Sequence, residues 1–295
     1  MIDILKKLIP KFKGGFSGVY PLTDSSYLLA TMDGVGTKVR IAINNDMHER
    51  VGEDLVNHCV NDVIVCGGNP KLFLDYLAFN TVDDVIFSRI IKSIRKTCSK
   101  YGVELLGGET AGMGNFYKVN EYDVCGTMIG FVDKKDYIDG SAVKRGDIII
   151  GLPSNGLHTN GYTMARKLLT VGEFQFSEYH TELLLKPHIC YKNVVDKIKS
   201  KIQIKSMAHI TGGGFSNIDR TLPDNLSANL FYSWKFPDIF KILQDASVDR
   251  GIDVDFYSEF NMGIGFTIVI DPNDLPVLKK ITRNFEVIGE ISDKK

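Results

Sequence analysis

Apolar residues alternate between two spacings along the first half of this chain. Mostly apolar or alternating runs are typical of strands, and apolar residues that repeat every three or four positions indicate helices. The run at 83–100 opens with two acids and repeats Ile86, Ile90, Ile94 and Cys98, so it predicts a helix. On the same basis we expect strands at 27–32, 71–79, 103–106 and 122–132 and another helix at 54–65.

The pattern repeats more loosely in the second half. It predicts strands at 148–152, 207–210, 262–270 and 286–291 and helices at 161–169, 182–198, 236–244 and 275–282. The polar stretch 133–147 separates the halves and predicts an N-terminal domain at 1–133 and a C-terminal domain at 142–295. The mixture of strands and helices makes the expected fold class α/β, or α+β.

Composition narrows the class of protein. A length of 295 residues fits about two domains. The 35 basic and 36 acidic residues leave a net charge of −1, so we expect neither nucleic acid nor a membrane as partner. Five cysteines without a C-x-x-C pair favour a cytoplasmic location. Leu5, Leu8, Ile9 and Phe12 stand at helical spacing, which favours a short helix docked on its own domain over one on a membrane surface.

The segment 33–38 (DGVGTK) is a candidate nucleotide-binding loop at the end of a predicted strand. It offers an acid that can hold a divalent metal, glycines that let the backbone approach a phosphate, a hydroxyl and an ammonium. Its spacing fits neither a Walker A loop nor a G-x-G-x-x-G fingerprint. A tight Asp-Gly hairpin turn is the competing interpretation.

Two further polar groups could complete a metal site. Asn61 and Asp62 stand inside an apolar helical pattern, where a buried carboxylate is costly unless it is paired or metal-bound, although a cap or a solvent-facing position is equally open. Glu109 directly follows a predicted strand. Together with Asp33, these acids would supply three oxygen ligands for Mg²⁺.

Two loops of the second half could hold a phosphate or a polar substrate. The loop 153–161 places His158 and Asn160 near a predicted helix N-terminus, although a plain loop with a capping Asn is as consistent. The glycines at 212–214 stand between a strand and a helix, where exposed amides could cradle a phosphate or positive φ angles could be needed. We expect His209 to be packed or hydrogen-bonded rather than catalytic.

Seven motifs in register closely resemble the phosphoribosylformylglycinamidine cyclo-ligase family, also called aminoimidazole ribonucleotide synthetases. They are DGVGTK (33–38), DLVNHCVND (54–62), FLDYLA (73–78), GGETAGM (107–113), YDVCGTMIGFV (122–132), PSNGLHTNGY (153–162) and HITGGGFSNI (209–218). The likeness runs from about residue 14 to the C-terminus. It implies a two-domain PurM-like fold. The N-terminal domain would be a mixed sheet with helices, whose strands pair across a homodimer, and the C-terminal domain would be α/β.

The resemblance also implies an activity and residue roles. The activity is ATP-dependent closure of formylglycinamidine ribonucleotide to aminoimidazole ribonucleotide, the fifth step of purine synthesis. Asp33, Asp62 and Glu109 would hold Mg²⁺, and His158, Asn160 and Asp62 would act in catalysis. The implied nucleotide- or phosphate-binding residues are Asp33, Gly34, Gly36, Thr37, Lys38, Asn61, Gly107, Gly108, Thr110, Gly212, Gly213 and Gly214.

The chain departs from the family pattern in three places. Gly112 replaces an acid and Gly114 a proline in the GGETAGMGNFY segment, which predicts a looser loop without one charged contact. The run Pro187-His188-Ile189 replaces a Pro-Thr-Arg-like run and removes a candidate basic contact to substrate. Relatives carry a longer segment before the first motif, so we expect closure over ATP to differ. The alternatives are another ATP-using enzyme of the superfamily, such as thiamine-monophosphate kinase, and a degenerate nucleotide-binding dimer.

Overall fold

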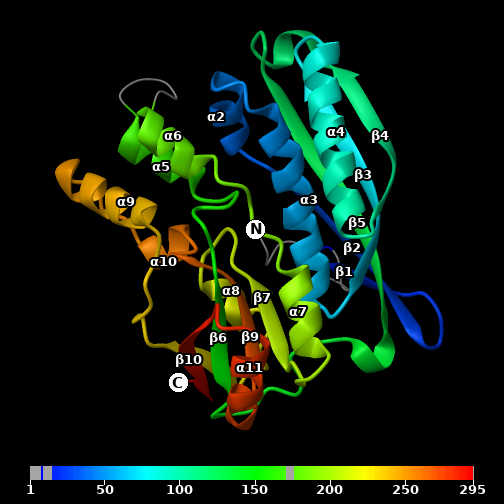
Figure 1. Cartoon of the computed structure of the whole chain (residues 1–295), viewed down its shortest axis with the longest axis vertical. Coiled ribbons are helices and arrows are strands. Elements are labelled where there is room, and N and C mark those ends of the chain that lie inside the picture. The colour runs from blue at the N-terminus through cyan, green and yellow to red at the C-terminus, as the bar shows by residue number, and fades with distance from the viewer. Residues whose placement is uncertain (1–7, 9–14, 171–175, 295) are drawn as a thin grey trace.

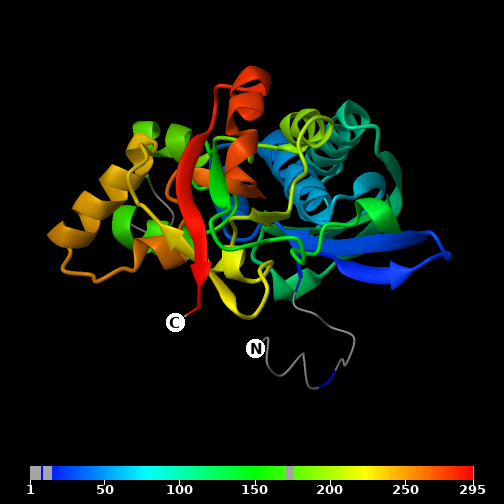
Figure 2. The ribbon, with the colours of Figure 1, turned by 90° about the horizontal axis from the view of Figure 1, so that it is seen from below.

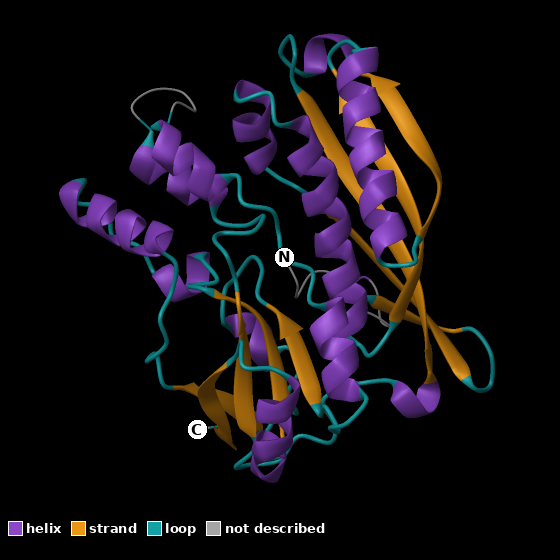
Figure 3. Cartoon of the chain, in the orientation of Figure 1, coloured by secondary structure: helices purple, strands orange, loops and turns teal. Residues whose placement is uncertain are grey.

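The computed structural model describes residues 8, 15–170 and 176–294, and the strands in this part of the chain form two five-stranded sheets (Figures 1 and 3). The N-terminal sheet has the order β1-β2-β5-β3-β4 and the C-terminal sheet the order β7-β9-β6-β10-β8. The predicted mixed α/β class is confirmed. The helix predicted near residues 5–12 lies outside the described residues, Leu8 excepted.

The N-terminal sheet is mixed, and helices cover one of its faces. Its strands are β1 (Gly18–Pro21), β2 (Ser26–Gly34), β3 (Asn69–Phe79), β4 (Glu104–Gly112) and β5 (Tyr122–Asp133); its helices are α2 (Lys38–Asn44), α3 (His48–Val65), α4 (Asp84–Lys100) and the 3-10 turns η1 (Gly114–Phe116) and η2 (Lys134–Asp136). Only β3 and β4 pair in parallel. The predicted helix at 83–100 is confirmed, and Asp83 is its N-cap. Figure 2 shows the β1-β2 hairpin, in blue, projecting away from β10.

The C-terminal sheet is antiparallel between all its described neighbours. Its strands are β6 (Ile148–Pro153), β7 (Ser206–His209), β8 (Leu226–Leu230), β9 (Ile264–Ile270) and β10 (Glu286–Asp293). The helices around it are α5 (Tyr162–Leu169), α6 (Glu178–Leu184), α7 (Lys192–Lys199), α8 (Ser216–Asp219), α9 (Asp238–Asp249), α10 (Phe256–Glu259), η3 (Pro272–Asp274) and α11 (Leu275–Ile281). Every residue of the apolar strand β9 is buried, so this strand forms the centre of the core.

The single helix predicted at 182–198 is wrong. The chain leaves the helical path after α6 and resumes it at α7, and Pro187 lies between them. Proline has no backbone N–H and excludes the helical conformation from the residue before it, so the helix cannot run through this point. The segment 185–191 is therefore extended enough to run along α3.

This segment joins the two halves of the molecule. Asn57 of α3 donates through Nδ2 to the carbonyl of His188 at 2.7 Å. Asn61 donates to the carbonyl of Ile189 at 2.8 Å and accepts from the backbone N–H of Tyr191 at 2.9 Å. Asn61 is fully buried in these contacts. Helix α3 therefore packs against the N-terminal sheet on one side and contacts a segment of the C-terminal half on the other (Figure 1).

Candidate functional site

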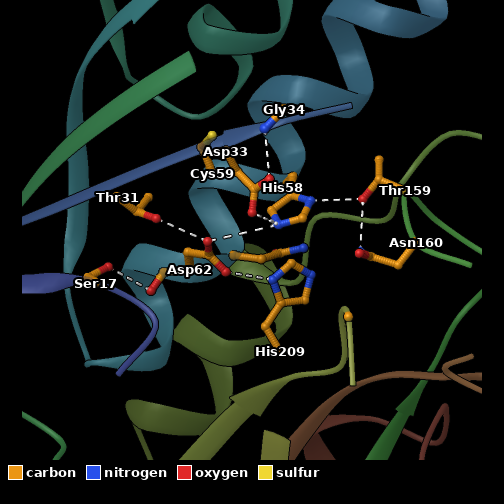
Figure 4. Close-up of polar contacts among 12 residues, drawn as sticks. Ser17, Thr31, Asp33, Gly34, His58, Cys59, Asp62, Thr159, Asn160 and His209 are labelled. Atoms are coloured by element: carbon orange, nitrogen blue, oxygen red, sulfur yellow. Dashed lines mark hydrogen bonds and ion pairs between the residues drawn. The ribbon is translucent and has the colours of Figure 1, made fainter. Parts of the chain in front are cut away.

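Two carboxylates and a histidine meet where β2 ends against α3 (Figure 4). His58 and Asp62 lie one helical turn apart, which brings both side chains to the same face of α3. Nε2 of His58 lies 2.8 Å from Oδ2 of Asp33 and 3.9 Å from Oδ2 of Asp62. Asp62 is buried and accepts a hydrogen bond from Thr31 at 3.1 Å, whereas the side chain of Asp33 is 43% exposed. One acid of the pair is thus accessible to a ligand and the other is fixed.

A chain of hydrogen bonds connects His58 back to Asp62 through the C-terminal half. Nδ1 of His58 lies 2.8 Å from the hydroxyl of Thr159, which lies 3.1 Å from Nδ1 of His188. Nε2 of His188 lies 2.9 Å from Nε2 of His209, and Nδ1 of His209 lies 2.8 Å from Oδ1 of Asp62. This confirms that His209 is packed and hydrogen-bonded. This chain of hydrogen bonds includes three of the six histidines of the protein.

A fourth histidine, His158, stacks on the ring of His188 with 4.1 Å between ring centroids. Its side chain is 1% exposed and its backbone has a φ of +63°, a conformation that non-glycine residues adopt at a cost. The sequence pattern did not single out His58 or His188, because one stands in an apolar helix and the other in a run predicted as helical. Only their shared position in the fold makes them a cluster.

Burial sets the charge of most of these rings. Desolvation lowers the pKa of His158 and of His188 well below the usual value, and it lowers the pKa of His209 despite the hydrogen bond to Asp62. Burial would also lower the pKa of His58, but the adjacent carboxylate of Asp33 outweighs burial, so that pKa is raised. Burial raises and His58 lowers the pKa of Asp33, and the net pKa lies below its usual value. His158, His188 and His209 are therefore neutral at pH 7.

The structure does not bring Glu109 to the other two predicted metal ligands within one chain. Through β3 and β5, Glu109 is in register with Gly34, the neighbour of Asp33. Three strand spacings amount to about 14 Å, and adjacent residues of a strand point to opposite faces of the sheet. Glu109 thus lies on the face away from α3 and Asp62, and the three acids form no single metal centre in one chain. Gly107, Gly108 and Thr110 lie with it in β4 rather than in a loop.

The DGVGTK segment is divided between surface and interior. Gly36, with a φ of +65°, and Thr37 are exposed at the start of α2, close to the end of β2. Lys38 is 1% exposed, pairs with Oδ2 of Asp54 at 2.7 Å and donates to the carbonyl of Lys186 at 2.7 Å. Burial lowers the pKa of Lys38 and raises that of Asp54. In this conformation the ammonium points into the protein, not toward the exposed loop.

Two loops of the C-terminal half lie beside the histidine cluster, since Asn160 contacts Thr159, the hydrogen-bond partner of His58. Asn160 is half-buried, and a side chain added at Gly212 would contact its amide. Gly213 and Gly214 have φ angles of +89° and +56°, so the competing interpretation, a loop that needs positive φ, is confirmed for these two glycines. Asn217 donates to the carbonyls of Gly212 and Gly214, and the N–H of the buried Gly214 donates to the carbonyl of Thr211 at 3.0 Å, so only Gly212 and Gly213 of the triplet are exposed. A surface hollow of about 330 Å³ adjoins Gly213.

Most of the chain is similar to one family of proteins. Residues 14–132 match the model of the AIR synthase related protein N-terminal domain, and residues 144–295 match that of its C-terminal domain. A phosphoribosylformylglycinamidine cyclo-ligase of Thermodesulfovibrio yellowstonii is 40% identical over an alignment 297 residues long, which covers 95% of this chain and 86% of that protein. One of Staphylococcus saprophyticus is 42% identical over 275 residues, 89% of this chain and 80% of that protein.

Solved structures share the fold at lower identity. AaThiL complexed with AMPPCP and TMP superposes with a TM-score of 0.69 at 17% identity, covering 100% of this chain and 90% of that one. A chain of the HypE-HypF complex gives 0.68 at 16% identity, covering 99% and 93%. T. maritima PurL complexed with ADP gives 0.62 at 18% identity, covering 98% and 45%. Among the described residues, no helix combines the length and apolar content needed to cross a bilayer.

Proposed function

The chain belongs to the phosphoribosylformylglycinamidine cyclo-ligase family, and we propose that it uses ATP to close the ring of aminoimidazole ribonucleotide in purine biosynthesis. The observation that carries this proposal is the identity of about 40% to enzymes of that name along nearly the whole chain. The geometry supports it, because acids, exposed glycine amides and polar loops of both halves meet at one place. The nucleotide analogue AMPPCP and the nucleotide ADP, named with two structures of this fold, support nucleotide use.

The chemistry needs activation of a poor electrophile. The γ-phosphoryl group of ATP passes to the formamide oxygen of the substrate, which gives ADP and an O-phosphorylated intermediate. The amidine nitrogen of the same molecule then attacks the activated carbon, loses a proton and expels phosphate as the C–O bond breaks. Because both reacting groups belong to one molecule, the protein mainly has to hold them in the reactive geometry and neutralise charge.

Gly36 and Thr37 would bind the ATP phosphates, and Asp33 with Asp62 would hold Mg²⁺. The fit to a cation rests on Nε2 of His58, which is buried between these carboxylates without a hydrogen-bond partner among the described residues. Bound there, Mg²⁺ would offset the negative charge of the phosphates. Asn61 acts indirectly, since its side chain fixes the segment at 189–191. Glu109 could join this cation only from a second copy of the chain.

Asn160 and the loop at Gly212–Gly214, through its exposed Gly212 and Gly213, would bind the substrate and its phosphate. Asn160 is adjacent to Gly212 and only half-buried, so its amide can reach a ligand above the loop. His158 is enclosed, and its ring stacks on His188. From this position it would fix the loop that carries Asn160 and orient the substrate through it.

Replacing His158 by alanine should lower kcat by about 100-fold, because a displacement of about 1 Å at the reacting groups has that effect. ATP affinity should change little, since the ring does not lie at the exposed loop of Gly36 and Thr37. Steady-state kinetics and ATP titration separate the two. His180→Ala on α6 is the matched control. A variant with wild-type kcat and substrate affinity would contradict the prediction and show that the loop at 153–161 is only a connection between β6 and α5.

A homodimer would cover the open face of the N-terminal sheet. Thr31 points toward α3, so Met32 points to the opposite face, where its side chain is 70% exposed. Tyr76, level with Gly34 on that same face, is 40% exposed. Uncovered apolar side chains on a sheet are typical of a protein interface.

The free thiols of the five cysteines support a cytoplasmic location.

Met32→Glu should convert the dimer to a monomer, because pairing would bury an unpaired carboxylate. Sedimentation velocity measures the change at micromolar concentration. Val248→Glu, at a site on α9 that is 79% exposed, should leave the dimer intact. A wild-type chain that sediments as a monomer would contradict the proposal.

The proposed activity is tested by ADP release from Mg·ATP with and without formylglycinamidine ribonucleotide, together with detection of the aminoimidazole product. ADP that depends on substrate and matches product one to one is the expected result. ADP without the product would favour another enzyme of this superfamily. Saturable ATP binding without turnover would favour the degenerate dimer.

A further inference from the structure

Four aromatic rings contact one another beside the surface hollow of about 330 Å³ that adjoins Gly213. They are Phe215, Tyr232, Trp234 and Tyr257, and the rings of Tyr232 and Tyr257 are closest, with 4.5 Å between their centroids. Phe215 and Trp234 are buried, whereas Tyr232 is 53% exposed and Tyr257 is half-buried. The two tyrosines therefore present aromatic surface to the hollow.

The backbone holds this aromatic wall in place. The carbonyl of Tyr257 accepts from the backbone N–H of Phe215 at 3.0 Å. A side chain at Gly214 would place its Cβ 2.0 Å from the same carbonyl oxygen, so this contact requires glycine. Tyr232 has a φ of +51°, a conformation that non-glycine residues adopt at a cost. Because the wall is already formed, a ligand would not have to order it on binding.

The rim of the hollow is negatively charged. Asp219 ends α8, Asp255 is the N-cap of α10, and both are exposed. Oδ1 of Asp219 accepts from the backbone N–H of Ala228 at 3.1 Å, and Oδ1 of Asp255 accepts from that of Ser258 at 3.3 Å. Within the described residues, Oδ2 of neither acid has a hydrogen-bond or ion-pair partner, and no lysine, arginine or histidine lines the hollow.

This charge determines which ligands the hollow can bind. A phosphate or a carboxylate would lie beside two like charges with no counter-charge in the lining. A cation would pair with the free carboxylate oxygens and lie against the tyrosine rings, whose faces attract positive charge. The hollow thus differs from the neighbouring site proposed for the substrate phosphate, and neither Asn160 nor Gly212 lines it.

We propose that this hollow binds a small organic cation that carries a guanidinium group. A guanidinium is flat and stacks on aromatic rings, its N–H groups pair with a carboxylate through two parallel bonds, and it is more weakly hydrated than an ammonium. The volume of about 330 Å³ lies in the range of small-molecule sites, so the hollow fits a metabolite. The proposal goes beyond the ring-closure reaction and does not rest on it.

The test is titration of agmatine, a guanidinium compound without a carboxylate, into the full-length protein at constant ionic strength. Trp234 is the one tryptophan of the sequence and its ring contacts both tyrosines, so its fluorescence reports on the hollow. We expect a saturable change in this fluorescence, and isothermal titration gives the Kd.

Asp219→Asn and Asp255→Asn should each weaken agmatine binding by about 10-fold, because each removes a charge and keeps an oxygen that can accept the backbone N–H. Tyr257→Leu should weaken it by about 3-fold to 10-fold through loss of the ring face. Asp224→Asn removes an exposed acid that does not line the hollow and should bind agmatine as the wild type does.

An absence of saturable agmatine binding to the wild type, or wild-type affinity in both asparagine variants, would overturn the proposal. So would a change in Trp234 fluorescence that inorganic phosphate produces and agmatine does not, which would assign the hollow to the substrate phosphate instead. These titrations use neither ATP nor formylglycinamidine ribonucleotide. A chain that fails the ring-closure assay therefore still tests this site.

Discussion

Asp62→Asn should reduce aminoimidazole formation by at least about 100-fold and weaken ATP binding in the presence of a divalent cation. The substitution keeps the shape of the side chain and removes the negative charge that the cation needs. It also replaces one of the two acceptor oxygens by an NH₂ donor, so the acceptor that orients His209 is no longer guaranteed by either rotamer. Losses of this size follow removal of one preorganised charged group from an active site. Isothermal titration with ATP, with and without the divalent ion, measures the binding part.

The matched control is Asp245→Asn, an exposed acid on α9 that should leave both quantities unchanged. The dimer should also persist in Asp62→Asn, since this side chain lies on the α3 side of the N-terminal sheet. Unchanged nucleotide affinity in Asp62→Asn would remove the metal assignment. A loss of the folded state instead would mean that Asp62 is a structural member of the histidine chain only.

Local pattern predicted most of the fold, and the exceptions have physical causes. Period-two and period-four repeats located the long strands and helices, because those elements bury one face, although the predicted start of α3 and the predicted end of β4 were each six residues off. The short strand β1 and the seven-residue helix α2 are too brief to show a period. The predicted helix at 182–198 failed at Pro187, although proline is a visible breaker, because the apolar spacing on both sides continued.

The site was less predictable because its contacts join distant parts of the chain. Asp62 and its chemistry stood out as a carboxylate in an apolar helix. Its partner His209 is 147 residues away, and His188 is 131 residues from Asn57, which holds it. No spacing rule reports such pairs. The separation of Glu109 from Asp62 was likewise not predictable from the sequence. It depends on the strand register, which places Glu109 on the face of the sheet away from α3, and not on the sequence neighbours of either residue.

Lys38 separates the sequence interpretation from the structural one most sharply. The DGVGTK motif predicts an ammonium on the ATP phosphates. In the folded chain, the ammonium lies in a buried ion pair with Asp54, and both side chains are 1% exposed. It also holds the carbonyl of Lys186, and Asp54 accepts from the backbone N–H of His188 at 2.7 Å. The pair therefore fastens the segment at 185–191 to the N-terminal half.

Lys38→Met should lower the free energy of unfolding by about 3–5 kcal/mol, because it leaves the Asp54 carboxylate buried without a countercharge. Urea denaturation followed by circular dichroism measures this loss. Lys192→Met breaks a more exposed pair with Asp196 and should cost at most about 1 kcal/mol. Adding Asp54→Asn to Lys38→Met should recover part of the stability, since a neutral amide can still accept from His188. Wild-type stability of Lys38→Met together with a loss of ATP affinity would contradict this prediction. It would mean that the ammonium leaves Asp54 to bind the nucleotide, as the DGVGTK motif predicts.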